Sequence, residues 1–375
     1  MRLAYLSTDP GITWGGAKGA SIHIGEVAEA LAAAGAEVLV LASSVDPGSR
    51  CPKGLAVEAL PGPGKGASVA HRLAAEPART AWLEDRLRRF GATALYERLA
   101  LHSGAGHLVA AAAGIPHVVE VNAPLVYEAL RFRRLDSAED AVRLENEVLA
   151  GADLVLPVSR PLADHVKARG ARRVEILPNA VAIERFAAPT RRQATPPVAI
   201  FAGRLRPWHG VDTIAEAWRL LGPAAPGLRV VGDVENRKAL DAVGAELTGA
   251  VSHDDMPAAL LTADIGLAPY AADAPDYFSP LKLFEYLAAG LAVIAGSLPG
   301  ITDIVDDASA VLIPPGDAQA LADAVGDLAA DPERRASMGR AGRALVAAHH
   351  TWDSRARRIM ELVDQLRRDP SVARR

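Results

Sequence analysis

The sequence predicts an α/β protein built from two Rossmann-like halves in tandem. Its 375 residues exceed the usual size of one core, and hydrophobic residues make up 50% of the chain, which is enough for two cores. Residues 3–42 follow the order strand, glycine-rich loop, helix, strand, which is a βαβ unit of a parallel sheet. A second βα series begins at Val198.

The first half alternates short apolar runs with amphipathic runs. The apolar runs predict strands at residues 3–7, 37–42, 95–96, 118–121 and 154–158. The amphipathic runs predict helices at residues 21–34, 72–90, 140–151 and 160–169. Residues 46–66 are rich in proline and glycine and are predicted to be irregular, and residues 176–180 close the half.

The second half repeats this alternation after a polar, proline-bearing stretch, residues 187–197, which we predict to be a linker. Strands are predicted at residues 198–202, 228–232, 247–249, 265–268, 293–294 and 310–313. Helices are predicted at residues 211–221, 236–243, 256–262 and 318–328. A long terminal helix over residues 352–368 carries one apolar stripe.

Composition excludes several classes of protein. The net charge is −4 and no basic face is evident, so nucleic acid is not an expected partner. The single cysteine, Cys51, excludes a disulfide framework and a multi-cysteine metal site, and it fits a reducing cytosol. The first ten residues are too short and polar for a secretory signal, so we expect a cytoplasmic protein. The arginines at 367, 368, 374 and 375 are interpreted as a solvated end, and weak contact with anionic lipid is the alternative.

Residues 276–301 carry the most specific pattern in the chain. A loop with Ser279 and Pro280 leads into a short helix that contains Glu285 and ends at Gly290, where glycine accepts a left-handed backbone, and a Val-Ile strand follows. Corners of this kind bind nucleotides in doubly wound α/β proteins. The segment closely resembles the donor-binding corner of family-4 retaining glycosyltransferases, in which a glutamate holds the ribose of a nucleotide-sugar.

This resemblance covers nearly the whole chain and implies the GT-B fold. In that fold two Rossmann-like domains face each other across a cleft, and a C-terminal helix crosses back to the first domain. It implies an acceptor-binding domain at residues 1–187, a nucleotide-sugar-binding domain at 198–350 and the returning helix at 351–375.

Two glycine-rich loops are candidate phosphate sites, because glycines let backbone N–H groups approach an anion. Gly15, Gly16 and Lys18 lie in the first loop, which is neither a P-loop nor a GxGxxG motif. It resembles the family's loop that closes over the donor phosphates, and a tight turn with Ser21 as helix N-cap is the alternative.

The second loop follows the strand at residues 198–202. Gly203 leaves room for close backbone approach, and Arg204 is a bidentate donor suited to a pyrophosphate. A surface ion pair is the alternative for Arg204. His209 stands where the family usually has a lysine, and because histidine titrates near neutral pH, Lys282 is the candidate for the missing charge.

The chain departs from the family pattern at the first of its two glutamates. That position falls on Tyr277, beside Asp276, so Asp276, Tyr277 or the loop backbone contacts the donor sugar. Asn122 stands near the place of a family histidine, and Glu97 and Glu120 are candidates for acceptor contact or structural carboxylates. The remaining donor-site candidates implied by the resemblance are Val251, Ser279 and Leu281.

The resemblance implies a retaining transferase that moves a sugar from a nucleotide-diphosphate sugar to a hydroxyl acceptor. Asn122, Arg204 and Lys282 are the candidate catalytic residues, no further cofactor is implied and no metal site is expected. The donor base (UDP, GDP, ADP or TDP), the sugar, the acceptor and the oligomeric state stay open. The alternatives are another GT-B enzyme, such as a sugar-nucleotide epimerase or a glycan phosphorylase, and a non-catalytic nucleotide-sugar-binding protein.

Overall fold

The computed structural model describes residues 1–49, 51–132, 135–186, 196–203, 206–233 and 237–369. The chain divides into two compact units. The first unit comprises Met1–Pro178 together with Trp352–Arg375, and the second comprises Asn179–Thr351. Each unit has its own parallel sheet, so the predicted pair of Rossmann-like folds is confirmed.

The first unit contains a six-stranded sheet in the order β3-β2-β1-β4-β5-β6. Its strands are β1 (Arg2–Ser7), β2 (Glu37–Ala42), β3 (Leu55–Ala59), β4 (Ala94–Arg98), β5 (His117–Val121) and β6 (Leu154–Pro157). Every neighbouring pair is parallel. The order reverses between β1 and β4, and at such a switch point open α/β sheets bind ligands beyond the carboxyl ends of the strands.

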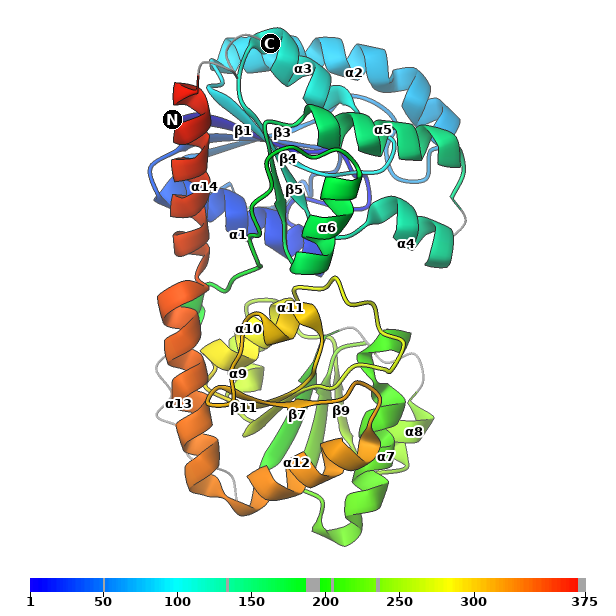
Figure 1. Ribbon diagram of the computed structural model, residues 1–375, viewed down its shortest axis with the longest axis vertical. Helices are drawn as coiled ribbons and strands as arrows, with labels where there is room; N and C mark the ends of the chain where they lie inside the picture. Colours follow the sequence, from blue (N-terminus) through cyan, green and yellow to red (C-terminus); the bar gives the residue numbers. More distant parts are fainter. Residues whose placement is uncertain (50, 133–134, 187–195, 204–205, 234–236, 370–375) are drawn as a thin grey trace. The chain divides into compact units, whose positions relative to one another are not determined.

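Helices cover both faces of this sheet (Figure 1). They are α1 (Gly19–Ala33), α2 (Val69–Phe90), α3 (Ala105–Ala113), α4 (Leu125–Phe132), α5 (Ala138–Gly151), α6 (Arg160–Ala168) and α14 (Trp352–Arg368). α2 and α3 pack together over one face, where Leu39, Leu83 and Val109 share a buried cluster. The final helix, α14, packs beside α1 and buries the apolar stripe that its sequence predicts.

The second unit repeats this topology in the order β12-β11-β10-β7-β8-β9. Its strands are β7 (Val198–Ala202), β8 (Gly227–Val231), β9 (Glu246–Gly249), β10 (Ile265–Ala268), β11 (Ala292–Gly296) and β12 (Ala310–Ile313). Its helices are α7 (Val211–Leu221), α8 (Lys238–Asp241), α9 (Met256–Leu260), α10 (Leu281–Ala288), α11 (Pro299–Thr302), α12 (Ala318–Ala330) and α13 (Pro332–His349). The switch point lies between β7 and β10.

Several predicted elements need correction. Residues 46–66 are not irregular throughout, because β3 pairs with β2 at the sheet edge, where half-exposed strands carry a weak hydrophobic pattern. The sequence did not predict α3, α4 or α13, and α13 is rich in arginine and alanine, so its apolar periodicity is weak. Residues 187–195 of the predicted linker, and Arg374 and Arg375, lie outside the described residues.

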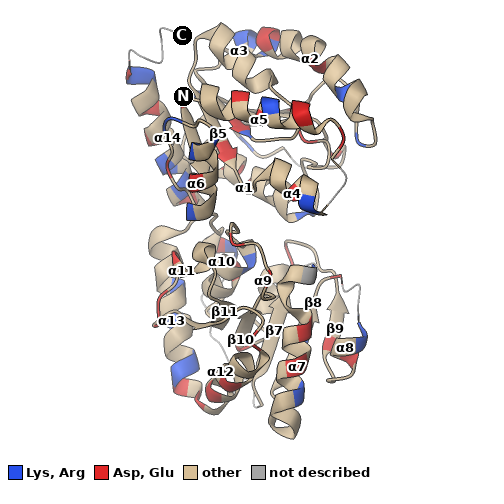
Figure 2. Cartoon of the chain, turned by 45° about the vertical axis from the view of Figure 1, so that its right-hand side comes forward, with Lys and Arg blue, Asp and Glu red and all other residues tan. Residues whose placement is uncertain are grey.

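Acidic and basic residues are interspersed along helices such as α2 and α5 (Figure 2). Each of these helices carries ion pairs between neighbouring turns, including Arg88 with Asp85 and Arg143 with Glu147. Such exposed pairs contribute little to stability, about 0–1 kcal/mol each. The charge pattern is that of solvated helix faces.

Candidate functional site

Helix α10 is held against the sheet of the second unit by Tyr286. The Tyr286 hydroxyl accepts a hydrogen bond from the backbone N–H of Ala202 at 2.7 Å, at the carboxyl end of β7. The ring lies against Gly266 of β10, where an added Cβ would be 2.8 Å from ring atoms. The helix ends as predicted, with Gly290 in the left-handed region at φ +68°. α10 is therefore fixed at the switch point between β7 and β10.

Lys282 and Glu285 lie three residues apart on α10 and share its partly exposed side, while Leu283, Phe284 and Tyr286 are buried. The Lys282 Nζ is buried and has no hydrogen-bond partner among the described residues. It lies 3.8 Å from the centre of the Phe201 ring and would be 3.6 Å from a Cβ added at Gly203. The structure thus brings Lys282 to the glycine loop after β7, as the sequence suggested.

The charge of Lys282 depends on pH near neutrality. Burial lowers the pKa of Lys282 to about 7, and the nearby Glu285 carboxylate raises it only in part. A buried ammonium is costly unless it is paired, so an anionic partner would stabilise the protonated form of this lysine. An anion beside Gly203 would therefore stabilise the protonated form of Lys282.

The loop after β7 forms a tight turn at residues 207–209. The Arg206 N–H donates to His209 Nδ1 at 3.2 Å, so this nitrogen is an acceptor and carries no proton in this arrangement. Gly210 has φ +72°, and a Cβ there would be 2.8 Å from the Tyr270 carbonyl oxygen. The loops after β7 and β10 are therefore in backbone contact at the switch point. Arg204 lies outside the described residues.

Aromatic rings hold the loop that precedes α10. The Phe278 ring stacks on Trp208 and Tyr270, with ring centres 6.2 and 6.1 Å apart. Tyr277 is buried and meets Phe278 edge-on, whereas Asp276 is exposed. Of the two residues that could replace the family's first glutamate, only Asp276 presents its side chain to solvent.

Ser279 anchors the same loop to the start of the second unit. Its Oγ accepts a hydrogen bond from the Asn179 N–H at 3.0 Å, and its carbonyl oxygen accepts one from Asn179 Nδ2 at 2.6 Å. Leu281 opens α10, and Val251 follows β9 and packs on the core beneath the loop. The structure brings Gly203, His209, Ser279, Lys282 and Glu285 to one edge of the sheet.

In the first unit, the glycine loop packs on the loop after β2. Gly15 has φ +79°, and a Cβ there would be 2.3 Å from Ser49 Cβ. Lys18 is exposed, and its Nζ donates to the Gly11 carbonyl oxygen at 3.4 Å. Ser21 is not the N-cap of α1, because the helix begins at Gly19 and Ser21 Oγ accepts the Thr13 N–H at 3.1 Å. A Cβ added at Gly16 would be 3.1 Å from the same Ser21 Oγ.

Glu120 sits buried near the carboxyl end of β5 in a set of polar partners. The Tyr96 hydroxyl donates to it at 2.6 Å and Arg98 at 2.9 Å, and His23 Nε2 lies 2.6 Å from its Oε1. Asn122 Nδ2 also donates to Oε1. Burial opposes ionisation, but His23, Arg98 and Tyr96 outweigh it and lower the pKa of Glu120 to about 2.

Of the two interpretations of Glu97, acceptor contact and structural carboxylate, its surroundings favour the second. Side chains alternate along a strand, and because Arg98 pairs in register with Glu120, Glu97 points to the opposite face. There it is 1% exposed, and its Oε2 lies 2.8 Å from His117 Nε2. A Cβ added at Gly106 of α3 would be 2.0 Å from the same oxygen, so α3 packs directly against this carboxylate.

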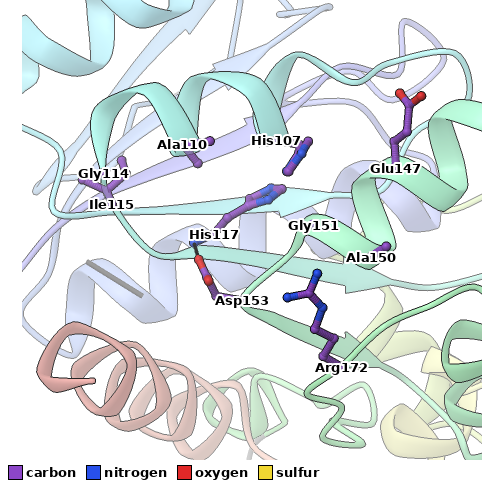
Figure 3. A pocket seen from close by; sticks show the side chains of 11 residues that line it. His107, Ala110, Gly114, Ile115, His117, Glu147, Ala150, Gly151, Asp153 and Arg172 are labelled. Carbon is purple, nitrogen blue, oxygen red and sulfur yellow. Dashed lines mark hydrogen bonds between the residues drawn. The ribbon is translucent and has the colours of Figure 1, made fainter. Parts of the chain in front are cut away.

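One pocket of about 400 Å³ lies at the opposite edge of this sheet (Figure 3). Its polar lining comes from His107, His117, Glu147, Asp153 and Arg172. His117 begins β5 and Asp153 immediately precedes β6, so the pocket opens at the amino ends of the strands. It is separate from the carboxyl-end edge that carries Glu120 and Asn122.

Two models of known protein families match this chain, one in each unit. The family model of glycosyl transferases group 1 matches residues 196–331, and that of the glycosyl transferase 4-like domain matches residues 18–180. The matches fall on the two Rossmann-like units in the expected order. This chain belongs to the family-4 glycosyltransferases of the GT-B fold.

Relatives of this chain carry out different transfer reactions. It is 26% identical to a D-inositol 3-phosphate glycosyltransferase of Xylanimonas cellulosilytica, over 94% of this chain and 92% of the relative. It is 28% identical to a GDP-mannose-dependent monoacylated alpha-(1-6)-phosphatidylinositol monomannoside mannosyltransferase of Corynebacterium glutamicum, over 50% of this chain and 55% of the relative. The chain thus spans about half the length of the first mannosyltransferases that it matches.

Solved structures share the fold of this chain. Anabaena Alr3699/HepE in complex with UDP-glucose has a TM-score of 0.72 at 16% identity, over 97% of this chain and all of that one. At this identity the likeness establishes the fold.

Sequence reasoning missed several side chains of this glycosyltransferase that shape both edges. His23, Tyr96 and Arg98 surround Glu120, and the signal for them was a carboxylate inside the apolar run His117–Val121, which must find partners when buried. Tyr270 and Phe278 hold the loop that precedes α10, and nothing in their spacing indicated that they stack.

Neither a metal-binding cluster nor a membrane-crossing helix occurs among the described residues. No cluster of three or more histidine, cysteine or carboxylate side chains there could hold a metal ion. No helix in that part of the chain combines the length and apolar content needed to cross a bilayer.

Proposed function

We propose that this protein is a retaining glycosyltransferase whose second unit binds a nucleotide-diphosphate sugar and whose first unit binds a hydroxyl acceptor. The observation that carries the proposal is the buried Lys282 ammonium beside Gly203, at the carboxyl-end switch point of the second sheet. A diphosphate supplies the anion that this ammonium lacks. Glu285, on the same face of α10, accepts hydrogen bonds from the ribose hydroxyls.

Catalysis in this proposal depends on charge at the leaving group. As the sugar departs, negative charge grows on the diphosphate, and protonated Lys282 stabilises it in a site shielded from water. Arg204, from the sequence pattern, is a second cation for the same group. Asp276, exposed before α10, contacts the hydroxyls of the donor sugar.

A donor panel tests the proposal directly. The protein is incubated with UDP-, GDP-, ADP- and TDP-sugars, and its melting temperature and nucleoside diphosphate release are measured. A preferred donor raises the melting temperature by mass action and is turned over when an acceptor is added. A protein that no nucleotide-sugar stabilises is not a transferase of this class, and one that binds without turnover favours the non-catalytic alternative.

Replacing Glu285 with alanine should weaken donor binding without unfolding the protein. The variant loses charge-assisted hydrogen bonds worth roughly 1.5–3 kcal/mol, so the donor Kd should rise about 10- to 100-fold. Isothermal titration calorimetry measures the change. Glu216→Ala is the matched control, because Glu216 is an exposed residue of α7 that pairs with Arg219 of the same helix, and the variant should bind donor normally. Unchanged affinity in folded Glu285→Ala would remove Glu285 from the ribose contact.

Transfer should retain the anomeric configuration. An inverting reaction needs a general base for the acceptor hydroxyl, and the carboxylate at the acceptor edge, Glu120, is buried, hydrogen-bonded and a weak base with a pKa of about 2. The departing phosphate oxygen takes the proton instead, on the face from which the acceptor attacks. NMR of the product of an α-linked donor should show an α-linkage, and a β-linkage would contradict the mechanism.

A further inference from the structure

We propose that Glu120 is a positioning residue that orients the Asn122 amide, so that Asn122 offers its carbonyl oxygen to a substrate hydroxyl. This inference rests on the proposed function, in which the first unit binds the acceptor. It assigns a role to a buried charge that the transfer reaction does not otherwise use.

The first step concerns how Glu120 is held. Its carboxylate is 4% exposed and is contacted from α1 by His23 and from β4 by Tyr96 and Arg98, at 2.6–2.9 Å. His23 is itself buried and meets the Trp352 ring edge-on, with ring centres 5.0 Å apart. A carboxylate held by three side chains from two elements has one orientation, and the Arg98 guanidinium beside it keeps it ionised.

The second step concerns Asn122. An ionised carboxylate can only accept hydrogen bonds, so the Asn122 group that faces Glu120 must be the Nδ2 amide, as the contact to Oε1 shows. The amide is planar, and fixing Nδ2 turns the carbonyl Oδ1 away from the carboxylate. Asn122 is partly exposed just beyond the carboxyl end of β5. It therefore presents an acceptor, with the glutamate determining which way the amide lies.

The third step is the consequence for the substrate. A carbonyl oxygen binds a hydroxyl or another donor and repels a phosphate or carboxylate oxygen. The buried negative charge of Glu120 behind it adds to that repulsion. The group recognised at Asn122 is thus a neutral hydroxyl, and an anionic group of the acceptor must lie elsewhere.

A double-mutant cycle with the full-length protein tests whether Glu120 acts through Asn122. Glu120→Gln has an amide that can face Asn122 in either orientation, so the Asn122 amide is no longer fixed. Glu120→Gln and Asn122→Ala should each lower kcat/KM for the acceptor about 10- to 100-fold, the effect of misplacing a contact group by about 1 Å. The double variant should lose no more than Asn122→Ala alone. If the two losses multiply, Glu120 acts independently and the proposal is wrong.

Glu76→Gln is the matched control in the same unit. The Glu76 carboxylate, from α2, is also largely buried. It accepts hydrogen bonds from Ser103, Gly104 and Ala105 at the start of α3. This variant should lose stability while keeping kcat/KM. An equal loss of kcat/KM in Glu76→Gln would show that replacing any buried carboxylate of this unit lowers activity through its effect on folding. That result would overturn the positioning role.

A measurement without turnover separates this inference from the proposed function. With 15N-asparagine labelling, the side-chain amide signal that disappears in Asn122→Ala should show slow hydrogen exchange and one downfield-shifted proton. Exchange as fast as an exposed amide overturns the positioning role even if transfer is observed. The bound-amide signature in a protein that turns over no nucleotide-sugar supports the positioning and contradicts the proposed function.

Discussion

Replacing Lys282 with methionine is expected to stabilise the protein while weakening donor binding. Lys282 Nζ is buried without a hydrogen-bond partner among the described residues, so methionine removes a buried charge that no hydrogen bond there satisfies and keeps the packing against Phe201. Exchanging such a charge for an apolar side chain should raise the free energy of unfolding by roughly 1–3 kcal/mol at pH 6. The donor diphosphate loses its ionic partner, so its Kd should rise about 10- to 100-fold.

The pH dependence of the increase in the free energy of unfolding identifies its cause. Burial lowers the pKa of Lys282 from 10.5 to about 7, so between these values the folded protein has lost a proton that the unfolded chain still binds. The free energy of unfolding of the lysine protein therefore rises with pH over this interval, relative to the methionine variant. The advantage of methionine should be full below pH 7 and shrink toward pH 10. Urea unfolding at pH 6 and pH 9 measures it.

Lys238→Met is the control, because Lys238 is an exposed lysine of α8 in the same unit. It should alter neither donor affinity nor the pH dependence of unfolding. A Lys282→Met variant that is less stable than the wild type at pH 6 would show that the ammonium has a protein partner. One that binds donor normally would place the diphosphate elsewhere.

Replacing Gly300 with alanine should displace the loop that precedes α10, at Phe278 and Ser279. Gly300 lies in α11, and a Cβ there would be 1.6 Å from the Phe278 carbonyl oxygen and 3.7 Å from the Ser279 nitrogen. Both neighbours are backbone, so the loop must move away from Asn179 and from the aromatic stack on Trp208. Overpacking of this kind typically costs about 1–3 kcal/mol of stability.

The same substitution should also weaken donor binding. The displaced loop leads directly into α10, so Lys282 and Glu285 shift together and the donor Kd should rise at least about tenfold, as expected for misplaced binding groups. Calorimetry with the preferred nucleotide-sugar and urea unfolding check the two effects.

Gly326→Ala is the control for the glycine substitution. Gly326 lies inside α12, where an added Cβ makes an ordinary 3.6 Å contact with Leu221, so the variant should gain about 0.5–1 kcal/mol from helix propensity. If Gly300→Ala is as stable as this control and binds donor normally, the close approach to Phe278 is not required.

Local patterns predicted much of what positions the donor edge. The run from Ser279 to Gly290 encodes a loop, a short helix and a left-handed stop, all of which depend on neighbouring residues. The alternation of strands and helices likewise predicted two parallel sheets, since each βα unit is local. Glu285 and Lys282 could be assigned to one helix face by their spacing alone.

Long-range contacts explain where the predictions were incomplete. Glu97 and Glu120 look alike in the sequence, but the register of β4 against β5 turns them to opposite faces, and register is a property of the sheet. Strand β3 was missed because its half-exposed edge position weakens the apolar pattern. The stacking of Phe278 on Trp208 joins the loop after β10 to the loop after β7, so no local window contains it.

By itself, the sequence determined the α/β class, the two tandem sheets and the corner that carries Lys282 and Glu285, because hydrophobic period and glycine placement act over a few residues. Only the tertiary structure decided the chemical state of the side chains. The pKa of Lys282 near 7 and that of Glu120 near 2 arise from burial and from partners distant in sequence. Electrostatic energies depend on distance and solvent access, which are defined once the chain has packed.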